Sequence, residues 1–228
     1  MTLWYFITAL GGMGVTGSLS VAIAAWLAAA HCRVRALYWC LLFGCAMVLV
    51  IATKIVFIGW GLGLPTVDFT GFSGHATRAA AVFPVAAYLL LIQRTRWQRS
   101  VGVAGAVLLA MLVAYSRVVV KAHSGSEAVL GCMLGLLTAA AFIGLVRALR
   151  DFVPHPLLIG LTVLAVVVLP RLEPEPSAGV SSQQFMTGVA LHLSGHDRPY
   201  QRWNWKLARK PYVPPCSADR VHLRYLCI

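Results

Sequence analysis

The sequence predicts an all-α protein, in which a polytopic six-helix transmembrane bundle is followed by a C-terminal extracytoplasmic tail. Of its 228 residues, 59% are hydrophobic and 11% are charged, whereas a soluble domain usually carries about 25% charged residues. The apolar residues fall in six blocks separated by short basic or Gly/Pro-rich turns, at 3–30, 36–53, 75–92, 101–115, 127–146 and 156–169. Such a composition favours the bilayer over water as the solvent.

The lengths of these blocks favour membrane-spanning helices. About 20 apolar residues cross the hydrocarbon layer, which the longer blocks provide and the last one does not quite reach. No block shows the period-2 alternation of a transmembrane β-barrel. The first block has no Lys or Arg before Arg33, so it lacks the charged start of a cleavable signal peptide. We interpret it as a retained span, or as a span preceded by an interfacial stretch, and assign residues 1–170 to the transmembrane domain.

Residues 171–228 differ from the rest because they are polar, basic and rich in Pro. They form the predicted extramembrane tail, which contains Cys216 and Cys227. In an oxidising compartment these two could form a disulfide, and two reduced cysteines are the alternative. The tail either packs as an ordered segment near the mouth of a site or lies as a disordered basic segment on the membrane surface; the sequence leaves both open.

Arginines in three turns predict the orientation of the bundle. If six helices alternate, these turns share one side, and short cytoplasmic loops collect Lys and Arg. The connection at 59–72 on the opposite side has no Lys or Arg. We therefore expect a multi-pass protein of the plasma (inner) membrane, with its second and fourth connections and its tail on the extracytoplasmic (periplasmic) face. The arginines are Arg33, Arg35, Arg94, Arg96, Arg99, Arg147 and Arg150.

Ionisable residues gather at the predicted extracytoplasmic ends of the blocks. Charged side chains near membrane depth are costly, so their presence usually indicates function. Here they come from two distant stretches that alternation places on the same face, which favours one shared site over separate snorkelling side chains. The group consists of Lys54, Asp68, His75, Arg78, Arg117, Lys121, His123 and Glu127.

The spacing of these residues suits phosphate chemistry. His123 and Glu127 lie four residues apart, so we expect them on one face of a helix, where the carboxylate would set the imidazole tautomer and stabilise its positive charge. A helix that begins at Ser73-Gly74 would offer free backbone N–H groups to an anion. Lys54 adds a point charge, and Arg117 adds a planar fork suited to phosphate oxygens.

Together these groups match the needs of phosphoryl transfer. Charge on the transferred phosphoryl group requires cations and N–H donors, and the attacking and leaving atoms must lie in line. His123 can attack phosphorus, and His75 can protonate the leaving oxygen and then activate water. We expect no metal and no cofactor, because Lys54 and Arg117 supply the positive charge.

On these residues the chain resembles the type 2 phosphatidic acid phosphatase superfamily of integral membrane lipid phosphatases. That family carries three motifs: Lys-x6-Arg-Pro, Pro-Ser-Gly-His and Ser-Arg-x5-His-x3-Asp. The third is present here as Ser116-Arg117, His123 and Glu127, with Glu in place of Asp, and the second as Phe72-Ser73-Gly74-His75. The first survives only as Lys54, because Gly61 and Leu62 occupy the Arg-Pro positions.

The resemblance implies a role for each matching residue. His123 would be the nucleophile, assisted by Glu127, and His75 the acid, while Lys54, Ser73, Gly74 and Arg117 would bind phosphate. Arg78 or Lys121 is the candidate to replace the charge of the missing arginine. A second Ser-Gly-His, at Ser194-Gly195-His196, has no accompanying Ser-Arg-x5-His, so we interpret it as a coincidence or a separate feature of the tail.

The resemblance leaves the substrate and the acceptor open. The expected partners are a phosphorylated lipid and the surrounding membrane lipids, with no nucleic acid. Undecaprenyl diphosphate, phosphatidylglycerophosphate, phosphatidate and lipid A all suit an extracytoplasmic site. The alternatives are a phosphotransferase that passes the phosphate to another lipid or sugar, and a non-enzymatic membrane transporter or scaffold with a degenerate site. The oligomeric state is not predicted.

Overall fold

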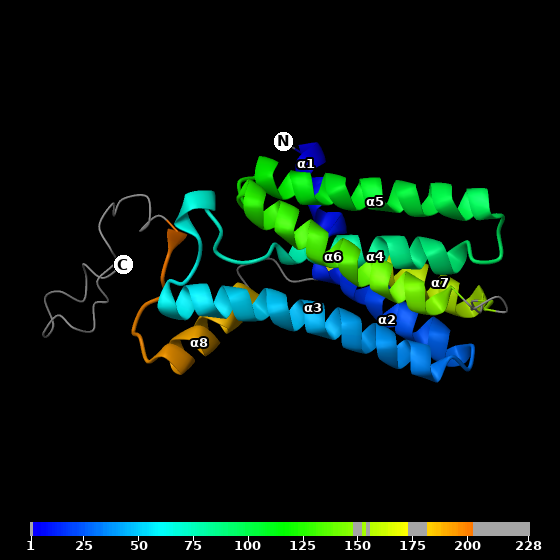
Figure 1. Cartoon of the computed structure of the whole chain (residues 1–228), viewed down its shortest axis with the longest axis horizontal. Helices are drawn as coiled ribbons and strands as arrows, with labels where there is room; N and C mark the ends of the chain where they lie inside the picture. Colours follow the sequence, from blue (N-terminus) through cyan, green and yellow to red (C-terminus); the bar gives the residue numbers. More distant parts are fainter. Residues whose placement is uncertain (1, 148–151, 154–155, 173–181, 203–228) are drawn as a thin grey trace, which may run out of the picture. The chain divides into compact units, whose positions relative to one another are not determined.

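The computed structural model describes residues 2–147, 152–153, 156–172 and 182–202, in which helices joined by turns and loops are the regular elements and no β-strand occurs (Figure 1). This confirms the all-α prediction. The elements are α1 (Thr2–Leu10), α2 (Met13–Ala29), α3 (Arg33–Trp60), the 3₁₀ turn η1 (Pro65–Val67), α4 (Gly74–Leu90), α5 (Arg96–Val119), α6 (Gly125–Val146), α7 (Pro156–Leu172) and α8 (Ser182–Ser194).

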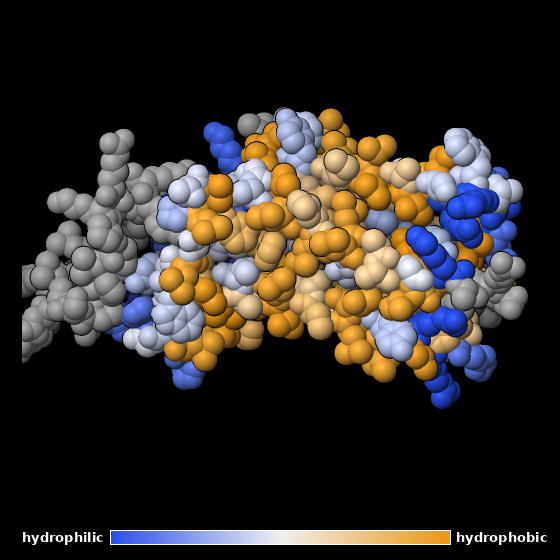
Figure 2. Space-filling model, viewed as in Figure 1, coloured by the Kyte–Doolittle hydropathy of each residue, from blue (hydrophilic) through white to orange (hydrophobic). Residues whose placement is uncertain are grey.

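Four helical stretches are long and apolar enough to cross a membrane: Leu3–Ala29, Arg33–Trp60, Arg96–Val119 and Gly125–Val146. Helices α4 and α7 have 17 residues each and are shorter than these. Large apolar side chains are exposed along the long helices, and Figure 2 shows apolar surface over most of the described face. The protein is therefore a membrane protein with at least four helical stretches of spanning length, whereas the count of six spans stays a prediction.

The chain divides into two compact units. The first comprises Met1–Val50 and Ser73–Glu173, and the second comprises Ile51–Phe72 and Pro174–Ile228. Helix α3 contributes its N-terminal part to the first unit and its C-terminal part to the second. The domain boundary expected at residue 170 stays a prediction.

Helix α4 is the buried centre of the first unit. Its residues Ala76, Ala79, Ala80 and Ala81 have no exposed surface, because small side chains let neighbouring helices approach closely. On α6, a Cβ atom at Gly135 would lie 2.3 Å from the Thr77 carbonyl oxygen, so only glycine fits there. The close packing of α4 and α6 brings their first turns together.

The first apolar block is not one continuous helix. It breaks at Gly11-Gly12, and Gly12 is the N-cap of α2. A Cβ atom at Gly11 would lie 2.6 Å from Val113 Cγ1 and 3.2 Å from His75 Cβ. The break therefore lets the turn between α1 and α2 pack directly against α4 and α5.

Basic residues mark the end of the first unit that lies away from the first turns of α4 and α6. The turns from α2 to α3 and from α4 to α5 carry arginines, as does the end of α6. In Figure 2 strongly hydrophilic surface gathers at this end, on the right of the view. The arginine-bearing turns thus share one end of the first unit, as alternation of the helices predicts.

The second unit contains a helix in the predicted tail, an element that the sequence analysis did not anticipate. Helix α8 packs on the C-terminal part of α3, where Ala190 joins Phe57 and Ile58 in a small apolar core. Cys216 and Cys227 lie outside the described residues.

Candidate active site

The first turn of α4 begins at Ser73, which does not use its side chain to cap the helix. The caps of α5 and α6 differ: Thr95 and Ser124 each form a capping box with the residue three positions later. The Ser73 hydroxyl is buried and has no hydrogen-bond partner among the described residues. The N–H groups of a first turn have no acceptor within their own helix. The start of α4 therefore presents a buried hydroxyl and backbone donors to an anion.

Helix α5 ends in a Schellman motif that turns the chain back toward α6. The Ala122 N–H donates to the Arg117 carbonyl at 3.0 Å, and the Lys121 N–H donates to the Val118 carbonyl at 3.0 Å. Lys121 takes the left-handed conformation, φ 58°, that this motif requires at its turning residue. The His123 N–H also donates to the Arg117 carbonyl, at 3.1 Å. This tight turn keeps Arg117 and His123 together.

His123 and Glu127 form a close pair, although not on one helix face as predicted. His123 precedes Ser124, the N-cap of α6, and Glu127 is the third residue of that helix. Its Oε2 lies 2.7 Å from His123 Nδ1 and accepts the Ser124 N–H at 3.3 Å. The carboxylate thus reaches back over the helix start, as the acidic member of a capping box does.

The pair sets the chemical state of the imidazole. The Glu127 side chain has no exposed surface, while that of His123 is 12% exposed. An ionised carboxylate only accepts hydrogen bonds, so an ionised Glu127 would accept from His123 Nδ1 and leave the lone pair on Nε2. In this geometry Nδ1 faces the carboxylate, and Nε2 is the ring nitrogen directed away from it.

A backbone hydrogen bond joins the two helix starts. The Ser73 N–H donates to the Glu127 carbonyl at 3.1 Å. On α6, a Cβ atom at Gly131 would lie 2.8 Å from the Ser73 carbonyl oxygen. The structure thereby brings together Ser73, Gly74 and His75 with His123 and Glu127, as the sequence analysis expected.

Arg117 completes this group from the last turn of α5. Its Nη1 donates to Thr8 Oγ1 at 3.3 Å, and that hydroxyl also lies 2.8 Å from Ser116 Oγ. Its Nε is buried without a hydrogen-bond partner among the described residues. An unsatisfied buried donor costs about 1–3 kcal/mol, so Arg117 Nε and Ser73 Oγ both favour an anionic ligand.

Helix α1 and the turn after it also contribute to the site, which the sequence did not predict. Thr8 anchors Arg117, and Gly11 packs on His75. Arg78, one turn beyond His75, donates from Nη2 to the Gly11 carbonyl at 3.2 Å and from Nε to Thr16 Oγ1 at 3.1 Å. These contacts depend on tertiary packing, and no local motif around Thr8 or Gly11 indicates them.

The two residues proposed to replace the missing arginine have different surroundings. Arg78 fastens the turn between α1 and α2, whereas Lys121 is exposed at the turn after α5. Lys54 belongs to the second unit, on α3, where a Cβ atom at Gly71 would lie 3.1 Å from its Cγ. Replacement of the missing arginine's charge by Arg78 or Lys121 stays a prediction.

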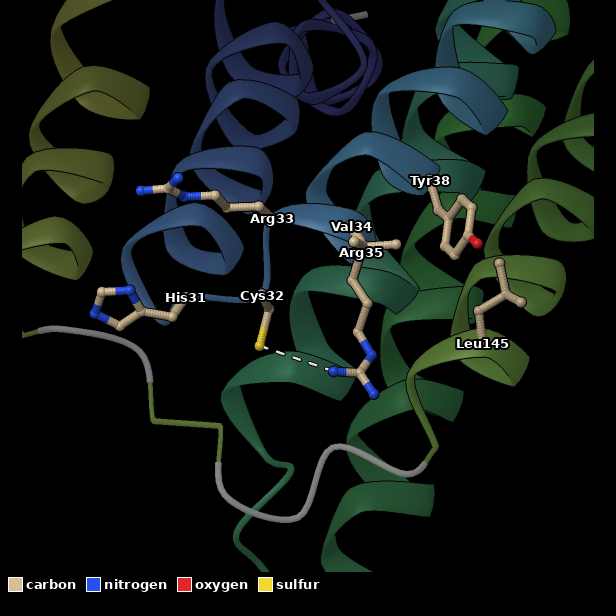
Figure 3. Close-up of a pocket in the computed structure, with 7 residues that line it drawn as sticks. All are labelled: His31, Cys32, Arg33, Val34, Arg35, Tyr38 and Leu145. Atoms are coloured by element: carbon tan, nitrogen blue, oxygen red, sulfur yellow. Dashed lines mark hydrogen bonds between the residues drawn. The ribbon is translucent and has the colours of Figure 1, made fainter.

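A separate pocket of about 440 Å³ lies at the basic end of the first unit (Figure 3). Arg35 Nη1 donates to Cys32 Sγ at 3.9 Å in its wall. Leu145 of this pocket and Gly125 at the start of α6 are about 30 Å apart at 1.5 Å per residue. The pocket is thus distinct from the histidine site. Its lining residues are His31, Cys32, Arg33, Val34, Arg35, Tyr38 and Leu145.

Within the described part of the chain, no three His, Cys, Asp or Glu residues gather in a way that could hold a metal ion. The cysteines described, Cys32, Cys40, Cys45 and Cys132, are free thiols. The histidine site comprises the His123–Glu127 pair, a second histidine, His75, and donors for an anion.

Comparison with known proteins agrees with this geometry. The family model described as the PAP2 superfamily matches residues 62–151, a region that includes both site histidines. A protein of Klebsiella pneumoniae described as "Uncharacterized 22.5 kDa protein in cps region" is 34% identical over 173 residues, which cover 75% of this chain and 81% of that protein. No solved structure gives a significant match.

Proposed function

The chain belongs to the PAP2 superfamily, and from this premise we propose that it is a metal-independent lipid phosphatase of the plasma membrane. It would hydrolyse a phosphate monoester or diphosphate of a lipid through a phosphohistidine. Family membership supports a phosphatase activity, and the apolar helices support a membrane location. The observation that carries the mechanism is the 2.7 Å contact between His123 Nδ1 and buried Glu127.

In the first step His123 Nε2 attacks phosphorus. A P–N bond forms while the bond from phosphorus to the leaving lipid oxygen breaks, and His75 gives its proton to that oxygen. Glu127 stabilises the positive charge that develops on His123. Lys54, Arg117, the Ser73 hydroxyl and the backbone N–H groups in the first turn of α4, from Gly74 onward, bind the phosphoryl oxygens, whose charge increases in the transition state.

In the second step His75 acts as a base. It takes a proton from water, the water oxygen attacks phosphorus, and the P–N bond breaks with return of the electron pair to His123 Nε2. Inorganic phosphate leaves and the histidine pair is restored. Neither step changes an oxidation state.

A lipid substrate is supported by the surroundings of the site. Tyr115, directly before Ser116-Arg117, contacts Trp4 in an edge-to-face pair with centroids 5.4 Å apart. Such aromatic pairs are typical of the level of lipid headgroups. The phosphate site would therefore lie where a lipid phosphate lies when its acyl chains remain in the bilayer.

Phosphate release from lipids in detergent tests this proposal. We expect the purified protein to release inorganic phosphate from at least one of undecaprenyl diphosphate, phosphatidylglycerophosphate, phosphatidate and lipid A. Orthovanadate should inhibit because it mimics five-coordinate phosphorus, and EDTA should leave the rate unchanged. Transfer of label to a second lipid or a sugar without phosphate release would identify a phosphotransferase instead. Loss of activity in EDTA would contradict the metal-independent mechanism.

We also propose that the site faces the extracytoplasmic side. The arginine-bearing turns form one end of the first unit, and the histidine site lies at the other end of α4 and α6. Labelling of single-cysteine variants on intact cells with an impermeant reagent checks this. A cysteine at Gly63 should react from outside, whereas a cysteine at Arg96 should react only after permeabilisation. The reverse pattern would place the site in the cytoplasm.

A further inference from the structure

The segment after α8 runs along the end of α3 and the loop that follows it, within the second unit (Figure 1). The Tyr200 N–H donates to the Ile58 carbonyl at 2.9 Å. His196 Nδ1 lies 2.7 Å from the Gly59 carbonyl oxygen, to which it donates because a carbonyl only accepts. We call residues 196–202 the clasp. The second Ser-Gly-His therefore takes part in a structural contact through His196. Its glycine, Gly195, has φ 71° and follows the end of α8.

The ring of Tyr200 occupies the space beside Gly61. A Cβ atom at Gly61 would lie 2.3 Å from Tyr200 Cδ1 and 2.5 Å from Cε1. Gly61 also has φ 68°, a conformation that residues with side chains rarely adopt. Position 61 is where the first motif of the family has arginine. Gly61 and Tyr200 therefore fit together in this chain: the Tyr200 ring of the clasp fills the space that a side chain at position 61 of the loop would need.

Arg202 brings a guanidinium to the same loop. Its Nη2 donates to Thr70 Oγ1 at 3.2 Å, and its Nε lies 3.5 Å from Asp68 Oδ1. Because Asp68 neutralises this charge, Arg202 is suited to holding the loop rather than to binding a phosphate directly. The pair is partly exposed, at 29% and 35%, so by itself it is weak. It acts together with the Tyr200 ring and the two backbone contacts.

The loop held by the clasp, residues 61–72, returns at its end to contact α3 beside Lys54. The Phe72 N–H donates to Thr53 Oγ1 at 3.4 Å, and a Cβ atom at Gly71 would lie 3.2 Å from the Lys54 backbone nitrogen. Between these ends the loop has little internal structure: η1 and a single bridge between Leu64 and Phe69. Contacts from outside the loop are therefore needed to reduce its conformational freedom.

We propose that the clasp positions the loop between Lys54 and Ser73 for catalysis, and that Tyr200 and Arg202 are positioning residues in place of the arginine absent at position 61. This inference rests on the proposed phosphatase function. The loop carries Lys54 at one end and continues at the other into Ser73-Gly74-His75. Fixing its shape would hold the backbone around Lys54 in one conformation, on which the position of the lysine ammonium group depends.

A charge exchange between Asp68 and Arg202 tests the proposal. Arg202→Asp and Asp68→Arg should each lower kcat/KM by about 10-fold, because a small displacement of positioning groups has effects of this size or larger. The double variant should recover to within about 3-fold of wild type, since the ion pair is re-formed with its charges exchanged. A double variant no better than the single ones, or single variants with wild-type kinetics, would overturn the proposal.

Matched variants separate positioning from loss of charge. Tyr200→Phe keeps the ring over Gly61 and should retain the wild-type rate, whereas Tyr200→Ala should lose about as much kcat/KM as Arg202→Asp. Arg33→Ala, at the basic end of the first unit, removes one positive charge and should have no effect. An equal loss in Tyr200→Phe and Tyr200→Ala would contradict the role of the ring.

A cross-link reports on the clasp independently of activity. A Cβ atom at Gly59 would lie 3.3 Å from Ser194 Cβ, close to the separation found in disulfides. Gly59→Cys with Ser194→Cys should therefore oxidise readily, and more slowly when Arg202→Asp loosens the clasp; peptide mass spectrometry identifies the bond. If Arg202→Asp slows the oxidation but the protein releases no phosphate, the clasp is supported and the phosphatase function is overturned. Equal oxidation rates, with unchanged kinetics, would overturn the clasp.

Discussion

Replacing His123 by alanine is expected to lower kcat by at least about 10⁴-fold, because the variant lacks the imidazole proposed to form the P–N bond. The side chain is 12% exposed and lies before the N-cap of α6, so its truncation removes no helical hydrogen bond. The variant should therefore insert and purify like wild type. Phosphate release under single-turnover conditions measures the loss.

His75→Ala is the informative contrast, since the two histidines have different roles. Without the acid, a lipid with a poor leaving group should react very slowly. A good leaving group, such as p-nitrophenolate, needs no proton, so the phosphohistidine should form and then persist because water is not activated. Acid-labile label on the His75→Ala protein, and none on the His123→Ala protein, is the expected pattern. His31→Ala, at the basic end, serves as the control with wild-type rate.

Full phosphate release by His123→Ala would rule out the nucleophile. Acid-labile phosphate retained on the His123→Ala protein but absent from the His75→Ala protein would make His75 the nucleophile and His123 the acid. Both outcomes leave membership of the family unaffected, because that rests on similarity across residues 62–151 and on the relative from Klebsiella pneumoniae.

Much of the site could be predicted because its residues lie in two short stretches at the ends of apolar blocks. Side chains at adjoining helix ends meet once the helices pack, and the order of the motifs identified which ends adjoin. The family prediction is confirmed by the comparisons. The assigned roles stay predictions, although the structure places Ser73, His75, Arg117, His123 and Glu127 in one unit.

The local geometry at His123 was predicted less well. The four-residue spacing suggested one helical face, whereas Ser124 begins the helix after His123. Ser124 followed three residues later by Glu127 is a capping-box signature. That signal in the sequence could have placed the helix start correctly.

Other features required the fold. Gly131 and Gly135 form a small-xxx-small pattern that indicates close helix packing, yet the pattern does not identify α4 as the partner. Thr8 and Tyr200 are far from the motifs in sequence, so their contacts with Arg117 and Gly61 come from tertiary packing alone. Helix α8 follows a polar, Pro-rich stretch, and the composition left open whether the tail is ordered or disordered.

Replacing Glu127 by glutamine should lower kcat by about 10²–10⁴-fold while leaving the fold intact. Glutamine also serves in a capping box, so its amide oxygen can take the place of Oε2, which accepts the Ser124 N–H at 3.3 Å and lies 2.7 Å from His123 Nδ1. The neutral amide, however, lacks the negative charge that would stabilise the positive charge developing on His123 during attack. An acid-to-amide change beside the catalytic histidine of a serine protease costs about 10⁴-fold.

Glu127→Asp provides the matched variant, because it keeps the carboxylate and restores the residue found in the family motif. Its shorter side chain must bridge a contact that is now 2.7 Å long, so we expect a loss of about 10-fold or less. Thermal unfolding in detergent should give similar midpoints for Glu127→Gln and wild type, which separates chemistry from stability. Wild-type kcat in Glu127→Gln would show that the buried carboxylate serves the helix cap alone and does not set the state of the nucleophile.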